Sequence, residues 1–74
     1  MTTIPMRDVA SGHIAKLGHH EGHLYVQFSN GDRYRYDNVP KATFERAFAP
    51  GTSAGKWLHS EVKGKFKHIN LGKA

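Results

Sequence analysis

The sequence predicts a small α+β domain in which an antiparallel β-meander of three to four strands is packed by two short C-terminal helices. Apolar and polar residues alternate over residues 23–37, which is the period of a strand buried on one face. After residue 40, apolar residues recur at helical spacing instead. Strands followed by helices are the α+β order, and we expect the helices to cover one face of the sheet.

The centre of the predicted sheet is a hairpin. Residues 24–28 and residues 33–36 each alternate in polarity, and the Asn-Gly pair at residues 30–31 between them is a strong hairpin signal. The Glu-Gly pair at residues 21–22 can turn the chain from a preceding strand that ends near His20.

The N-terminal part of the sheet is predicted from three apolar residues. Val9, Ile14 and Leu17 are interrupted by Ser11 and Gly12, which predicts a short strand, a bend and a second strand.

Two registers are open to the hairpin, and they give its tyrosines different roles. A two-residue loop would place three tyrosines on one exposed face, as a platform for stacking unpaired bases: Tyr25, Tyr34 and Tyr36. A three-residue loop with Gly31 in a left-handed bulge would instead turn Tyr34 and Tyr36 into the core and Arg33 and Arg35 outward. The turn residues allow both. Because burying unpaired arginines is costly, we favour the second register.

The first helix is predicted to begin at Pro40, which suits a first helical turn, with Asp37 or Asn38 as its cap. The second is predicted to be capped by Thr52 or Ser53 and to end at Gly64. Residues 65–69 are expected to form a short extended tail. The predicted core draws on sheet and helices: Leu24, Val26, Phe28, Tyr34, Tyr36, Phe44, Phe48 and Trp57.

Length and composition limit the possible functions. The 74 residues allow a single domain, 1–74, with a core of about residues 6–70, and exclude large multi-substrate enzymes. The absence of cysteine excludes disulfides and thiolate zinc sites. No apolar run is long enough to span a membrane and no secretory signal is present, so we expect a cytoplasmic protein.

The net charge of +5 belongs to the C-terminal quarter of the chain. Residues 1–55 carry six basic and five acidic residues, whereas residues 56–74 carry five lysines and one acid. A basic edge attracts phosphates, and arginines beside a tyrosine can add phosphate contacts and stacking. The candidate nucleic-acid-binding residues are therefore Tyr25, Arg33, Arg35, Lys56, Lys63, Lys65 and Lys67. A solvated, solubilising surface is the alternative interpretation of the same charges.

Metal binding and catalysis find no support in the residue pattern. His19 and His20 are adjacent and point to opposite faces of a strand, so that only His20 and His23 can converge. The acidic and serine residues show no catalytic spacing. We predict no metal site, no cofactor and no enzymatic activity.

Several motifs resemble the KTSC domain family. The start of its pattern is matched by Val9, Ser11, Gly12 and Ile14. Its centre is matched by the spacing of Phe28, Gly31, Tyr34, Tyr36, Val39 and Pro40. Its later part is matched by Ser53, Gly55, Lys56, Trp57, Lys63, Gly64 and Phe66. The family is named for a module at the C-terminus of some lysine-tRNA synthetases, and it also occurs alone in small bacterial and phage proteins. The family usually has a second serine at the position of Gly12, an aromatic residue at that of His19 and a tyrosine at that of Phe66.

The resemblance implies RNA binding. The sequence therefore predicts a non-enzymatic module that binds nucleic acid, RNA rather than DNA, through its basic C-terminal edge and its Arg/Tyr sheet face. The alternative is a protein–protein interaction module, such as a phage-encoded adaptor or an inhibitor of a host protein.

Overall fold

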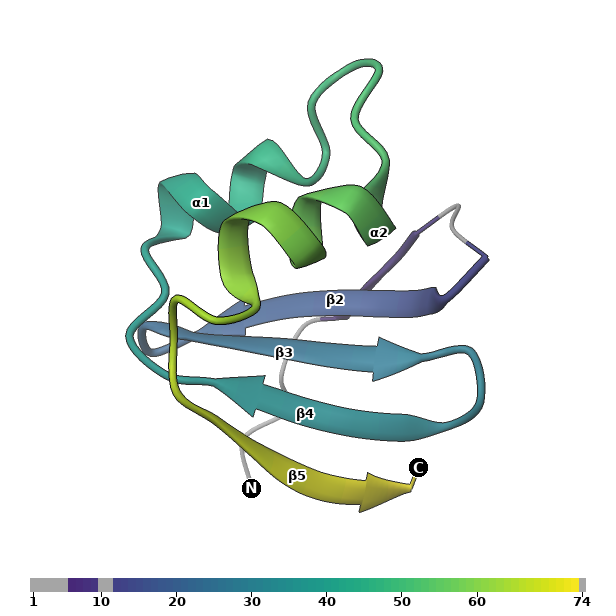
Figure 1. Ribbon diagram of the computed structural model, residues 1–74, viewed down its shortest axis with the longest axis vertical. Helices are drawn as coiled ribbons and strands as arrows, with labels where there is room; N and C mark the ends of the chain where they lie inside the picture. Colours follow the sequence, from purple (N-terminus) through teal and green to yellow (C-terminus); the bar gives the residue numbers. More distant parts are fainter. Residues whose placement is uncertain (1–5, 10–11, 74) are drawn as a thin grey trace.

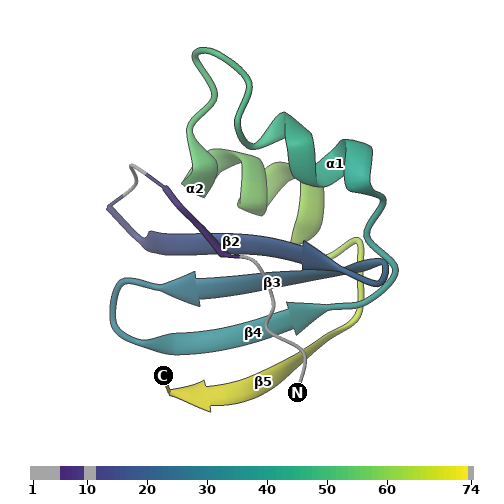
Figure 2. The same cartoon turned by 180° about the vertical axis from the view of Figure 1, so that it is seen from behind.

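A computed structural model of the protein describes residues 6–9 and 12–73. Its strands form one antiparallel sheet in the order β1-β2-β3-β4-β5, and its helices gather on one side of that sheet (Figures 1 and 2). The strands are β1 (Met6–Asp8), β2 (Ile14–His20), β3 (His23–Phe28), β4 (Asp32–Tyr36) and β5 (His68–Lys73). The α+β class is confirmed, but the sheet has five strands, so the prediction of three to four is wrong.

The ends of the sheet account for the difference. The predicted first strand is observed as β1, which ends one residue before Val9, and Ser11 in the predicted bend lies outside the described residues. The predicted tail is β5, which begins only at His68. Every residue of β5 is exposed, so the strand has no buried face, and backbone pairing to β4 holds it in place. The alternation of Ile69 and Leu71 with polar neighbours is the signal that could have predicted it.

The hairpin of β3 and β4 has the bulged register. Val26 lies opposite Tyr34, Leu24 lies opposite Tyr36, and Gly31 has a φ of 96°. The Gly31 amide donates to the carbonyl of Phe28 at 2.9 Å and closes the three-residue loop. Tyr36 is consequently buried, and both arginines of β4 point to the face that lacks helices.

The core lies between the sheet and the helices. Five of the predicted core residues are buried: Leu24, Val26, Tyr36, Phe44 and Trp57. The Trp57 Nε1–H group donates to the carbonyl of Thr43 at 2.9 Å, which satisfies the one polar atom of this large side chain. Phe28, Tyr34 and Phe48 are only partly buried and pack against the edge of the core.

The first helix, α1 (Lys41–Arg46), differs from the prediction at its start. Its N-cap is Pro40, and no side chain caps it. The caps predicted at Asp37 and Asn38 are wrong because the Asp37 carboxylate instead contacts Arg35 and His23, and because Asn38 takes a left-handed φ of 58°.

The second helix changes its hydrogen bonding halfway. It starts as α2 (Ala54–Trp57) after the N-cap Ser53, whose side chain makes no capping hydrogen bond. It continues as the π-helix η1 (Leu58–Val62), in which the Lys63 amide donates to the carbonyl of Leu58 at 2.8 Å. As predicted, the helix stops before Gly64, which has a φ of 79°. No helix of the described residues is both long and apolar enough to cross a membrane.

Candidate nucleic-acid interface

A groove opens between the second helix and the end of the β3–β4 hairpin. One wall belongs to α2 and η1 and carries Lys56, His59, Ser60 and Lys63. The other wall is formed by residues 12–14 and 28–30. The groove has a volume of about 1250 Å³, and an adjoining hollow of about 470 Å³ shares Phe28 and Lys63 with it. Lys63 therefore lies where the two spaces meet.

Aromatic rings line the adjoining hollow. The Phe28 ring meets Tyr34 edge-on at 5.6 Å between centroids, and His68 lies 5.7 Å from Tyr34 and 5.3 Å from Tyr36. Burial raises the pKa of Tyr36, and its neighbour Tyr34 raises it further, so Tyr36 stays uncharged at neutral pH. Tyr34 is only half-buried. The rings of Phe28, Tyr34 and Tyr36 offer a surface suited to contact with a flat ring, and the charged side chains of Asp32 and Lys63 line the hollow beside them.

Lys56 and Lys63 carry positive charge at the groove. Within residues 6–9 and 12–73, neither Lys56 nor Lys63 forms an ion pair. The nearby carboxylates are engaged elsewhere: Glu61 lies 3.0 Å from Arg46, and Asp32 lies 3.4 Å from Lys73. Two exposed ammonium groups are therefore available to an anion in the groove.

The structure separates the four predicted lysines into two pairs. Lys56 and Lys63 line the same groove, in agreement with their predicted placement on one side. Lys65 lies in the turn after η1, where its amide donates to the carbonyl of Val62 at 3.1 Å, and Lys67 precedes β5. Both are exposed, and neither lines the groove or the hollow. The prediction that residues 65–69 are extended is therefore wrong at Lys65, which lies in this turn.

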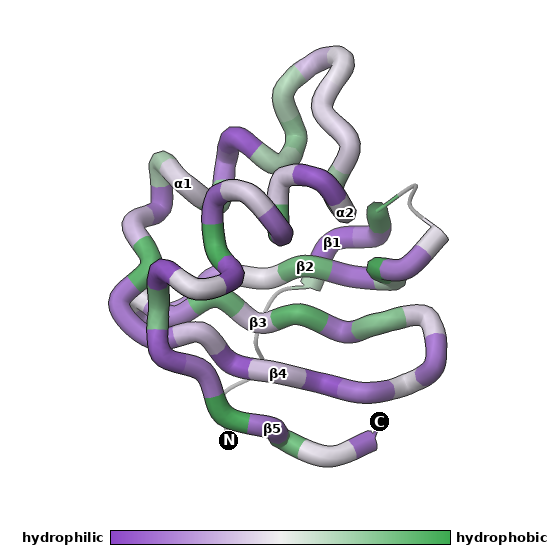
Figure 3. Tube along the Cα trace, in the orientation of Figure 1, coloured by the Kyte–Doolittle hydropathy of each residue, from purple (hydrophilic) through white to green (hydrophobic). Residues whose placement is uncertain are grey.

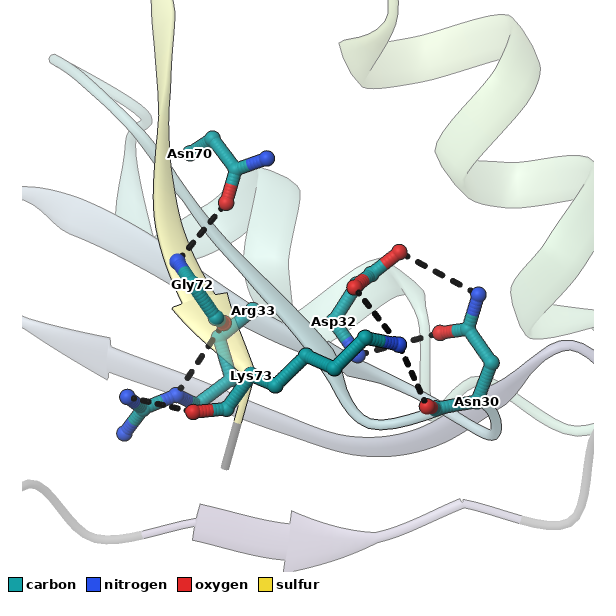
Figure 4. Close-up of polar contacts among 6 residues, drawn as sticks. All are labelled: Asn30, Asp32, Arg33, Asn70, Gly72 and Lys73. Carbon is teal, nitrogen blue, oxygen red and sulfur yellow. Dashed lines mark hydrogen bonds and ion pairs between the residues drawn. The ribbon is translucent and has the colours of Figure 1, made fainter.

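The other three predicted residues lie on the opposite face of the sheet. Tyr25 pairs with Arg35 across β3 and β4, so their side chains are neighbours there, as predicted. The Arg35 Nε donates to Asp37 Oδ1 at 2.8 Å. The Arg33 guanidinium donates to the backbone carbonyl of Lys73 at 3.1 Å and reaches that of Gly72 at 3.5 Å (Figure 4). It also reaches the carbonyl of Leu71 at 3.5 Å. Both guanidiniums thus already contact acceptors of the protein.

The histidines of β2 and β3 do not form a metal cluster. His19 Nε2 lies 2.6 Å from the carbonyl oxygen of Val39 on the helix side. His20 pairs with His23, whose Nδ1 lies 3.2 Å from Asp37 Oδ1 without hydrogen-bond alignment. In the part of the chain that the structure describes, no three His, Asp or Glu side chains are grouped to hold a metal.

A five-stranded antiparallel sheet with two short helices on one side defines a small α+β domain. The chain belongs to the KTSC domain family, whose family model matches residues 10–66. It is similar in structure to a KTSC domain protein from Yersinia pestis, with a TM-score of 0.85 and 25% sequence identity over 95% of this chain and 100% of that chain. No curated protein matches the chain.

Proposed function

We propose that this domain is a non-enzymatic RNA-binding module that holds a single strand in the groove between the second helix and the β3–β4 hairpin. The observation that carries the proposal is the pair of lysines, Lys56 and Lys63, that line the groove without an ion pair among the described residues. Ammonium groups in such a position attract phosphates and release their counterions, which favours binding regardless of base sequence.

The rings beside the lysines favour a single strand over a duplex. Stacking on aromatic side chains needs bases that are not stacked in a duplex. Phe28 and Tyr34 are partly buried rings at the adjoining hollow, and Lys63 borders both spaces. A strand whose phosphates follow the lysines can place a base against these rings. The family's occurrence in lysine-tRNA synthetases favours RNA over DNA.

The Arg/Tyr face is the weaker of the two candidate surfaces. Phosphate binding there would compete with the contact of Arg35 to Asp37 and with those of Arg33 to the carbonyls of β5. The lysines of the groove have no such competitor among the described residues. We therefore place the RNA on the helix side of the sheet.

Fluorescence anisotropy with a labelled ten-nucleotide oligouridine tests this proposal against a matched control. The variant Lys56→Ala/Lys63→Ala and the variant Lys65→Ala/Lys67→Ala each remove two charges from the same C-terminal segment. We expect the first to lose about tenfold in affinity and to reduce the slope of log K against log salt by about 1.4, because two phosphate contacts are lost. The second should lose less than about threefold, since its lysines act only at long range.

Two outcomes would contradict the proposal. Equal losses in both variants would show that only net charge matters, and binding that does not weaken with salt would exclude phosphate attraction altogether. An oligothymidine of equal length, which we expect to bind more weakly, separates RNA from DNA.

A further inference from the structure

Among the residues that the structure describes, the last strand, β5, forms a free edge of the sheet. Its backbone pairs with β4 on one side, and the Asp37 amide donates to the carbonyl of Lys67 at 2.8 Å. Hydrogen-bonded pairs alternate along an antiparallel ladder, so Ile69 also exchanges its hydrogen bonds with Arg35 opposite to it. The intervening residues, His68 and Asn70, then direct their backbone N–H and C=O groups away from the sheet.

The same edge carries exposed apolar side chains. Ile69 is 43% exposed and Leu71 37% exposed, and among the described residues these are the large hydrophobic side chains that are exposed. Figure 3 shows apolar colouring along part of β5. A partner strand would gain affinity from backbone hydrogen bonds to this edge. It would gain specificity from the side chain that it places opposite Ile69.

Polar contacts hold β5 in its extended form without a partner (Figure 4). Asn70 Oδ1 accepts from the Gly72 amide at 2.7 Å, and Lys73 Nζ lies 3.4 Å from Asp32 Oδ1. Arg33 donates to the carbonyl of Lys73, which secures the far end of the strand. The free edge is short and covers about residues 68–70. Because these contacts already order it, β5 loses little conformational entropy when a partner strand binds.

Charge indicates which strand fits. Residues 62–74 contain four lysines and no acidic residue, and Lys67 and Lys73 flank the free edge. A second copy of the chain, paired antiparallel about Asn70, would set Lys67 against Lys73, which is unfavourable. We propose that β5 binds an extended segment of another protein that carries an apolar residue opposite Ile69 and carboxylates at its ends. This surface lies outside the groove and shares His68 with the adjoining hollow, and the proposal does not depend on RNA binding.

An NMR titration of the labelled protein with the synthetic peptide EEVTVTVEE tests this inference. We expect the peptide to shift the amide signals of residues 68–70. The peptide KKVTVTVKK should bind at least about tenfold more weakly because of charge repulsion. Methylation of the central peptide amides should abolish binding. The variant Asn70→Pro removes an outward N–H group, which an edge strand tolerates, and should lose binding as well.

The matched control is Asn70→Ala, which loses the side-chain contact to Gly72 but keeps the backbone N–H group, and which should bind like the unchanged protein. No shift of these amides at millimolar peptide, equal binding of both peptides, or unchanged binding of the methylated peptide would overturn the proposal. A dimer that Asn70→Pro dissociates would overturn it too, because a second copy would then be the occupant. Lys56→Ala, which changes a groove residue outside residues 62–74, should weaken RNA binding but bind the peptide normally, which separates this result from the RNA test.

Discussion

Arg33 and Arg35 point from β4 to the same face of the sheet but have partners of different kinds. Arg35 contacts Asp37, two residues further along the chain. Arg33 contacts backbone carbonyls about 40 residues away, at the end of β5. A planar guanidinium with several donors can bind adjacent carbonyls in this way. Arg33, which the sequence pattern indicates as a phosphate ligand, therefore also connects two strands.

The substitution Arg33→Ala tests this connection. We expect a loss of about 0.5–1 kcal/mol in the free energy of unfolding, because the carbonyl contacts are exposed to solvent. Hydrogen exchange of the Ile69 amide should accelerate, whereas exchange in the β2–β3 ladder should not.

Lys16→Ala is the control for this substitution, since Lys16 is an exposed basic residue whose contact with Asp8 is long, at 3.9 Å. Unchanged exchange at Ile69 in the Arg33 variant would show that the arginine does not stabilise β5.

At the scale of elements, the β3–β4 hairpin depends on the bulge at Gly31. Its φ of 96° is disfavoured for a residue with a Cβ atom, although open space surrounds the position. We expect Gly31→Ala to lower the free energy of unfolding by about 1 kcal/mol, measured by urea denaturation. Gly12→Ala is the matched control because Gly12 has equal space and no positive φ. Equal effects of the two substitutions would contradict the role of the bulge.

The hairpin was predictable because local residues determine it. The turn at residues 29–31 and the alternation on both strands predict the hairpin, and the cost of burying Arg33 and Arg35 favours the observed register over the other one. β5 was predicted only as a short extended tail and not as a strand of the sheet, because a strand exposed on both faces shows no burial pattern. The π-helical turn of η1 has no local signal of the kind that a glycine or a cap provides.

The groove was predictable only in part. The spacing of Lys56 and Lys63 correctly places them together. The sequence assigns Phe28 to the core, however, whereas the structure places its ring at the edge of the core, where it lines the groove. His59 and Ser60 were not identified as groove residues because their position depends on how the second helix packs against the hairpin.

Across the whole molecule, the two sides of the sheet differ in how their charges are used. On the side without helices, Arg35 and Lys16 contact carboxylates and Arg33 contacts carbonyls. On the helix side, Arg46 contacts Glu61, whereas Lys56 and Lys63 line a groove and form no ion pair among the described residues. Under the proposed function, we therefore expect a polyanion to bind on the helix side.

An NMR titration of the labelled protein with ten-nucleotide oligouridine tests this assignment most directly, because side-chain signals report each face separately. We predict shifts of the Phe28 and Tyr34 ring signals and of the amides of residues 56–63, while the Tyr25 ring and the Nε–H signals of Arg33 and Arg35 stay in place. Shifts confined to Tyr25, Arg33 and Arg35, with the groove signals unchanged, would contradict it and place the RNA on the opposite face.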